Sequence, residues 1–287
     1  MNKTLKIIGV ISAVFIIRYF WHSHNQSKPQ STNAVTIMSY EKYKALKHEV
    51  PYLFKLIKPQ QCLFYFGANH SHDPENEQFL KLTEFWNEFL HQSSGKNCIV
   101  VLEGGTRPVH KTKDQAIIKD SEAGYATFLT QQASIPCISP EANDTFLETE
   151  LLKKFNADDV YFMRFADIWH QFNEIKKNKS HQNFANYIKK FNAFLGYKNL
   201  DQFKKIYQHH FHTTFDIDDE EKIRSIINLE HSTHIISKIH QYNNFLRDKF
   251  IVNQIKKLID EKKNIFIVFG ATHCVMQEPA LKSLWNS

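Results

Sequence analysis

The chain has 287 residues, of which 42% are hydrophobic and 14% aromatic, with only 8 glycines and 8 prolines. This composition suffices for one sizeable folded domain and excludes a disordered, collagen-like or linker-rich chain. The 36 basic and 30 acidic residues give a formal net charge of +6, but they are interspersed without an arginine-rich block, so nucleic acid is not expected as a partner.

The N-terminus predicts a membrane-directed segment followed by a tether. In residues 1–21, two lysines precede an uninterrupted apolar run from 7 to 17, which has the length of a signal peptide. The aromatic residues and arginine at 18–21 make an uncleaved membrane anchor the alternative. Residues 22–35 are polar and suit a tether. The positive-inside rule then places the body, residues 36–287, outside the cytoplasm, either membrane-anchored or secreted to the cell envelope.

Four short apolar runs predict β-strands that are buried on both faces. Between them, apolar residues recur at spacings of three and four, as in residues 79–89 and 147–155, which predicts helices. This alternation is typical of an α/β fold with a mostly parallel sheet and flanking helices. The four runs are CLFYFGANH at 62–70, CIVVLEGG at 98–105, IPCISPE at 135–141 and IFIVFGATH at 265–273.

A single α/β domain is therefore expected over residues 36–287, with its core at 60–157 and 264–287. The stretch 158–263 between the two core parts is helical in pattern throughout, so we interpret it as a large helical insertion. Its last part continues as one long helix into the final strand, as in a βαβ return.

The first and last of these runs close with nearly the same five residues, Phe-Gly-Ala-Asn-His at 66–70 and Phe-Gly-Ala-Thr-His at 269–273. A glycine at a strand end allows a sharp turn or a close approach to a ligand. His70 and His273 are therefore expected in the crevice beyond the carboxyl edge of the sheet. The loop residues expected to contribute to binding are Gly67, Asn69, Gly270 and Thr272.

The segment after His70 predicts the start of a helix, with Asp73 as N-cap and Pro74 in the first turn. This arrangement would leave His70 in a strand-to-helix loop, where the sites of α/β proteins usually lie. The other clustered histidines, at 209, 210 and 212, lack a carboxylate at ligand spacing, and we interpret them as solvated surface.

Glu103 and Glu141 end the second and third runs, so a parallel sheet would bring two carboxylates and two histidines to one rim. Such a set either holds a divalent metal (Mn, Co or Zn) with an open position for water, or positions water without metal. Glu141 has the alternative of capping the helix that follows it. The expected metal ligands are His70, Glu103 and His273, with His72 as a further candidate.

Arg247 lies on or near the packed face of the long helix. It is expected either to bind a substrate carboxylate or stabilise an oxyanion, or to pair with Asp248 or a carboxylate of the site. The four cysteines include no Cys-x-x-Cys pair, so a cysteine-based zinc site is not expected.

Two GxxH motifs, a strand-end glutamate and an arginine in the helix before the second motif resemble the superfamily that joins TraB and GumN-like proteins, Tiki metalloproteases, erythromycin esterases and ChaN-like haem-binding proteins. The similarity covers about residues 60 to 280, and residues 247–281 are especially similar to a bacterial branch. It implies a pseudo-symmetric α/β core with the site between the two GxxH loops. The matching residues are Gly67, His70, Glu103, Arg247, Gly270 and His273.

The resemblance implies a hydrolase that cleaves a peptide or ester bond in a peptide or small-molecule substrate. His70 and His273 would hold a metal or the attacking water, Glu103 would be a ligand or general base, and Arg247 would steady negative charge. Because ChaN-like members bind haem, the alternative is a haem- or metal-binding envelope protein without catalysis. A membrane-tethered interaction protein on a decayed hydrolase fold is a third class.

Overall fold

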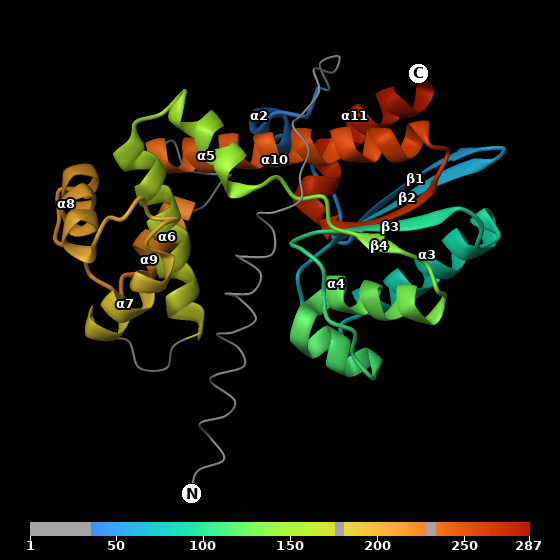
Figure 1. Cartoon of the computed structure of the whole chain (residues 1–287), viewed down its shortest axis with the longest axis horizontal. Coiled ribbons are helices and arrows are strands. Elements are labelled where there is room, and N and C mark those ends of the chain that lie inside the picture. The colour runs from blue at the N-terminus through green and yellow to red at the C-terminus, as the bar shows by residue number, and fades with distance from the viewer. Residues whose placement is uncertain (1–35, 176–180, 228–233) are drawn as a thin grey trace, which may run out of the picture. The chain divides into compact units, whose positions relative to one another are not determined.

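The structure, a computed structural model, describes residues 36–175, 181–227 and 234–287. The expected N-terminal anchor and tether lie outside the described residues. Among the helices of the described part, none combines the length and apolarity that crossing a membrane requires. The described residues form two compact units (Figure 1): a core unit, residues 36–143 together with Arg247–Ser287, and a helical unit within Asp144–Leu246.

The core unit contains a five-stranded sheet in the order β1-β2-β5-β3-β4. Only β1 is antiparallel to its neighbour, and the remaining pairs are parallel. The predicted α/β class with a mostly parallel sheet is thus confirmed. The strands are β1 (Tyr52–Lys58), β2 (Gln61–Ala68), β3 (Cys98–Leu102), β4 (Cys137–Ile138) and β5 (Asn264–Gly270).

The edge strand β1 was not predicted from the sequence. Its residues are mixed, with Phe54 buried and Lys55 exposed, because this edge strand is covered less completely than the central strands. By contrast, every residue of β2 and β5 is buried, as the continuous apolar runs predict for central strands.

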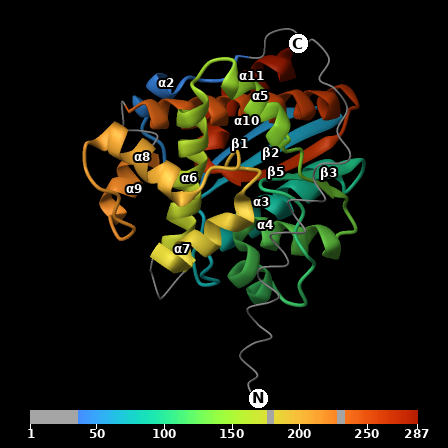
Figure 2. The ribbon, with the colours of Figure 1, turned by 60° about the vertical axis from the view of Figure 1, so that its left-hand side comes forward.

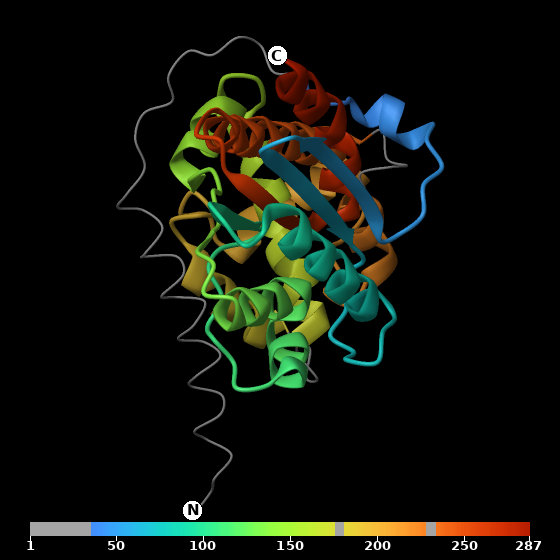
Figure 3. The same cartoon turned by 90° about the vertical axis from the view of Figure 1, so that its right-hand side faces the viewer.

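Helices cover both faces of the sheet (Figure 3). The helix α11 (Ala271–Asn286) lies on one side, and α3 (Gln78–Ser93) and α4 (Lys113–Gln132) lie on the other. On the α3 side, Phe64 and Phe266 pack against Phe85 and Phe89, with ring centroids 4.9 to 5.8 Å apart. These aromatic contacts bury large apolar areas between α3 and the middle of β2 and β5. A short helix, α2 (Tyr40–Lys44), precedes β1.

The helix after the first motif starts later than predicted. The Asp73 side chain accepts the Glu75 amide proton at 3.1 Å and closes a turn, whereas α3 begins only at Gln78. Asp73 and Pro74 therefore form a turn rather than a helix start, because the side chain of Asp73 bonds a backbone group only two residues ahead. His70 consequently lies in a longer loop than the sequence predicts.

Figure 2 shows the helices of the helical unit. Their buried side chains form a core of their own that is rich in aromatic residues. Phe165 stacks on Phe203 with ring centroids 4.4 Å apart, and the indole of Trp169 donates to the Ile217 carbonyl at 2.8 Å. The helices are α5 (Asp144–Leu152), α6 (Ala157–Ile175), α7 (His181–Ile188), a 3-10 turn η1 (Lys189–Phe191), α8 (Leu200–Phe211), α9 (Glu220–Ile227) and the first half of α10 (Ile235–Asp260).

The bounds of this unit, 144–246, lie earlier than the expected insertion at 158–263. Leu151 of α5 belongs to its aromatic core, and the second half of α10 belongs to the core unit. One histidine of this unit also departs from expectation: His210 is only 12% exposed and lies 2.8 Å from the Asp159 carboxylate, so it is packed rather than solvated.

Candidate functional site

The two Phe-Gly-Ala-x-His sequences lie on adjacent parallel strands. Ala68 of β2 pairs with Gly270 of β5, so the motifs run side by side with a shift of one residue. Their histidines nevertheless occupy different environments. His70 follows β2 in a loop, whereas His273 lies in the first turn of α11, which begins directly after β5. Similar motifs therefore present one exposed and one buried imidazole.

Each glycine of the two motifs permits a different close approach. A Cβ on Gly67 would lie 2.7 Å from the Cβ of Cys274 and 2.9 Å from the Tyr52 carbonyl oxygen. A Cβ on Gly270 would lie 3.0 Å from Nε2 of His70 and 3.5 Å from Oε2 of Glu103. Gly67 thus lets α11 approach the sheet, whereas Gly270 leaves room for the site.

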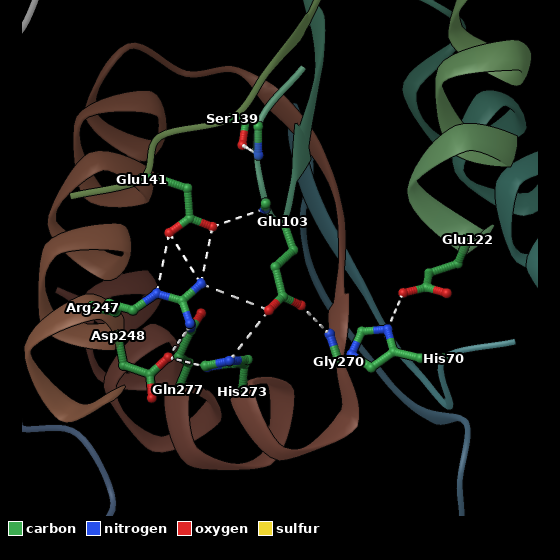
Figure 4. A network of polar contacts seen from close by, with 12 residues as sticks. His70, Glu103, Glu122, Ser139, Glu141, Arg247, Asp248, Gly270, His273 and Gln277 are labelled. Carbon is green, nitrogen blue, oxygen red and sulfur yellow. Dashed lines mark hydrogen bonds and ion pairs between the residues drawn. The ribbon is translucent and has the colours of Figure 1, made fainter. Parts of the chain in front are cut away.

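His70 pairs with a buried carboxylate from α4. Its Nδ1 lies within hydrogen-bond distance of Glu122 Oε1, and the side chains are 63% and 5% exposed, respectively. The hydrogen bond to Glu122, opposed by desolvation, raises the pKa of His70. Although burial alone would raise the pKa of Glu122, the bond and charge of His70 lower it. Figure 4 shows the His70 ring with Nδ1 toward Glu122 and its other edge beside Gly270.

Glu122 is presented by a break in α4. Asp120 and Ser121 have non-helical backbone angles, and Ser121 has φ 56° and ψ −145°, a conformation that is costly for any residue except glycine. The Ser121 hydroxyl accepts the Ser71 amide proton at 3.2 Å and lies against the second oxygen of Glu122. The break therefore connects the His70 loop to the carboxylate that its ring contacts.

His273 lies between two carboxylates. Its Nδ1 is 2.6 Å from Asp248 Oδ1, its Nε2 is 3.4 Å from Glu103 Oε1, and its side chain is 11% exposed. Burial would lower the pKa of His273, but the charges of Asp248 and Glu103 outweigh it and raise the pKa to about 10. Because both nitrogens face acceptors, His273 is a protonated imidazolium at neutral pH.

Glu103 is the centre of this network (Figure 4). Its Oε2 accepts the Gly270 amide proton at 2.7 Å, and its Oε1 lies 3.8 Å from Nη2 of Arg247. Burial opposes ionisation, but the charges of His273 and Arg247 and the backbone bond hold the pKa of Glu103 well below its usual range. Glu103 is therefore an ionised carboxylate and a weak base at neutral pH.

Glu141 and Arg247 form the outer part of the network. Nη2 of Arg247 lies 3.2 and 3.3 Å from the two oxygens of Glu141, and Glu141 Oε1 also accepts the Gly104 amide proton at 2.9 Å. Burial would lower the pKa of Arg247, but Glu141, Glu103 and Asp248 raise it. Arg247 is thus paired with site carboxylates and remains 24% exposed.

The expected metal ligands face other protein groups in this arrangement. The two ring nitrogens of His273 are directed at Asp248 and Glu103, and Nη2 of Arg247 lies 3.8 Å from Glu103. Across the described ranges, no group of three or more His, Cys, Asp or Glu side chains is arranged to hold a metal ion. His72 lies outside the network, with its Nδ1 3.0 Å from the Ile118 carbonyl oxygen.

Two of the expected loop residues, Asn69 and Thr272, form hydrogen bonds with residues outside the site. The Asn69 backbone is bound at both its N–H and its carbonyl by the side chain of Gln78. The Thr272 hydroxyl lies 3.1 Å from the hydroxyl of Tyr43 in α2. Asn69 therefore contributes to the structure of the His70 loop, and Thr272 contributes to the contact between α11 and α2. The structure brings together the remaining expected site residues: His70, Glu103, Glu141, Arg247, Gly270 and His273.

Three residues of the site have no role in the sequence-based prediction: Glu122, Asp248 and Gln277. The sequence indicates Asp248 only as a partner for Arg247, whereas in the structure it contacts His273. Gln277 follows His273 by four residues in α11, so both lie on one face of the helix. This spacing is a signal in the sequence that could have identified Gln277 as a neighbour of His273. Glu122 had no such signal, because its position depends on the break in α4. Comparisons with protein-family models, curated proteins and solved structures found no match to this chain, so the functional inference depends on the geometry of these residues.

Proposed function

We propose that the protein is a hydrolase of peptide or ester bonds in which His70 activates the attacking water. The observation that carries this proposal is the pairing of His70 with Glu122. An exposed imidazole whose Nδ1 is bound to a buried carboxylate, and whose Nε2 lies beside Gly270, has the arrangement of a general base. Hydrolysis of a peptide or ester bond is also what the resemblance of the two GxxH motifs to the superfamily implies.

In this mechanism the Nδ1–H of His70 donates to Glu122, which keeps the lone pair on Nε2. Nε2 takes a proton from water as the water oxygen attacks the carbonyl carbon of the substrate. The protonated ring then gives that proton to the leaving amine or alkoxide as the bond to carbon breaks. Glu122 stabilises the imidazolium that forms between these two steps.

The positive charge of Arg247 would act on the substrate oxygen, while His273 stays bound to carboxylates beside it. Both contact Glu103, which holds them at one side of the site, and Arg247 is partly exposed. Such a fixed cation stabilises the negative charge that develops on the carbonyl oxygen during attack. In this proposal Glu103 organises the cations, in place of the expected role as metal ligand or general base, because its ionised form is too weak a base.

The test compares two neighbouring histidines. The full-length protein is assayed against a panel of activated esters and short peptides, with His70→Gln as the variant and His72→Gln as the control. Removing the general base is expected to reduce kcat by about 10²- to 10⁴-fold, whereas His72→Gln should leave it unchanged. Equal activity of wild type and His70→Gln would refute the proposal.

The same preparations test the haem alternative, in which the exposed Nε2 of His70 would be the iron ligand. Each protein is titrated with haemin and followed by absorption spectroscopy. A stoichiometric Soret band that disappears in His70→Gln but not in His72→Gln, together with no hydrolysis, would support haem binding in place of catalysis.

A further inference from the structure

A buried hydrogen-bonded chain leads from His273 into the core unit, away from the exposed His70. The Tyr65 hydroxyl donates to Gln277 Oε1 at 2.9 Å, and Gln277 Nε2 donates to Asp248 Oδ1 at 2.7 Å. The same oxygen of Asp248 lies 2.6 Å from Nδ1 of His273. Tyr65, Gln277 and Asp248 are each 0% exposed, and they come from β2, α11 and α10. Figure 4 shows Gln277 and His273 on the same side of Asp248.

The donors and acceptors of this hydrogen-bonded chain fit together in only one way. A tyrosine hydroxyl bound to the Gln277 amide oxygen leaves the amide nitrogen to face Asp248. Asp248 Oδ1 then receives two N–H donors, one from Gln277 and one from His273, which its two lone pairs can accept. The orientation of the His273 ring is therefore determined by the buried residues of this hydrogen-bonded chain.

The cost of burying Asp248 argues against a purely space-filling role. Its second oxygen, Oδ2, is buried without a hydrogen-bond partner within the described residues, and a buried carboxylate is expensive unless its partners compensate for desolvation. An apolar side chain would fill the same volume between α10 and α11 at lower cost. What Asp248 adds is a fixed acceptor for Nδ1–H of His273.

We infer that Asp248, held by Gln277 and Tyr65, is a positioning residue that orients His273 so that its Nε2–H faces Glu103. Asp248 touches no substrate. It acts through His273 on Glu103 and hence on Arg247, which Glu103 contacts, so its kinetic consequence rests on the proposed hydrolase function. The GxxH pattern does not contain these hydrogen-bonded residues, and the sequence assigns them no role in orienting His273.

Asp248→Asn is the direct test, because it keeps the shape and one acceptor oxygen but removes the charge. The matched control is Asp167→Asn, since Asp167 lies 3.0 Å from His240 in the helical unit and forms a second His–Asp pair. With the full-length protein, kcat for Asp248→Asn is expected to fall about tenfold or more while KM changes by less than about twofold, a smaller loss than removal of a direct oxyanion donor causes. Asp167→Asn should leave both constants unchanged.

A second readout does not depend on activity. In protein labelled with ¹⁵N at histidine, the ring signals of His273 are identified by their loss in His273→Gln. Wild type should show both nitrogens protonated at neutral pH, and Asp248→Asn should move these signals toward the neutral ring. Unchanged His273 signals in a folded Asp248→Asn protein would overturn the inference, even if the wild type hydrolyses nothing.

If Asp248→Asn does not fold, Tyr65→Phe replaces it. This change removes only the hydroxyl that holds the Gln277 amide, and it should shift the His273 ring signals less than Asp248→Asn would. Unchanged signals in folded Tyr65→Phe would equally overturn the inference. A shift of the signals without any hydrolysis by wild type would keep the positioning role and reject the proposed function, so the two failures are distinguishable.

Discussion

The ring of His70, from the first Phe-Gly-Ala-x-His sequence, lies against Gly270, from the second, where a Cβ would be 3.0 Å from Nε2 and 3.4 Å from Cε1. The one-residue shift between β2 and β5 places this glycine opposite Ala68 and so beside the loop that carries His70. The two motifs are therefore parts of one site, in which one provides an exposed imidazole and the other provides the space that it occupies.

Gly270→Ala is expected to reduce activity with little loss of stability. The added methyl group would meet the end of the exposed His70 side chain, which can rotate away at small cost but then leaves its productive position. A 1 Å displacement of a catalytic group can cost about 10²-fold in kcat. The measurement is kcat on the best ester or peptide substrate, together with the thermal midpoint.

Gly67→Ala is the matched control, because it adds the same methyl group to the other motif. Here the neighbours are the Cys274 Cβ and the Tyr52 carbonyl, which cannot move without shifting α11 or β1. We expect a loss of about 1–3 kcal/mol in the free energy of unfolding, measured by denaturant titration. Equal stability of the two variants would contradict this assignment of roles.

Glu122→Gln should lower the plateau rate and also move the acidic limb of the pH–rate profile to lower pH. The carboxylate raises the pKa of His70, and a general base works only when deprotonated, so the acidic limb of kcat/KM reflects that raised pKa. Without the charge, the pKa of His70 falls and the limb moves to lower pH, while the rate on the plateau falls by about 10²-fold or more because the imidazolium is no longer stabilised. A pH–rate profile from 5 to about 9 measures both. An unmoved limb would show that a group other than His70 sets it.

His273 should make stability depend on alkaline pH. Its pKa is raised from 6.5 to about 10 in the folded protein. The unfolded chain loses the proton near pH 6.5, so the stabilisation is fully present below that pH, declines above it and is lost as pH rises through about 10. We expect the free energy of unfolding to fall over this range in wild type. In His273→Gln the part of the fall due to this residue should be absent, and an identical slope in both proteins would contradict the assignment.

Two substitutions at Ser121 separate its backbone from its hydroxyl. Ser121→Gly and Ser121→Ala both remove the contact with Glu122, but only glycine adopts φ 56° and ψ −145° without strain. Ser121→Gly should therefore be the more stable of the two by about 1 kcal/mol or more in thermal or denaturant unfolding. If Ser121→Ala is as stable as Ser121→Gly, the break in α4 is not strained in the way that its angles indicate.

The sequence by itself determined the features that depend on local pattern. Continuous apolar runs predicted the buried strands β2, β3 and β5, since a strand covered on both faces needs apolar side chains at every position. Parallel strands end at one edge of the sheet, which is why His70, Glu103 and His273 could be grouped before any geometry was known. The edge strand β1 was not predicted, because its partly exposed residues give a mixed pattern of polar and apolar side chains.

The tertiary structure alone decided what each of these groups can do. The pairing of Glu122 with His70 joins residues 52 positions apart through a break in α4, and no local pattern predicts such a break. Nearly identical motifs present an exposed imidazole and a buried imidazole because a turn follows His70, whereas a helix starts directly before His273. Protonation depends on burial and on charges a few ångströms away, and only packing sets these distances.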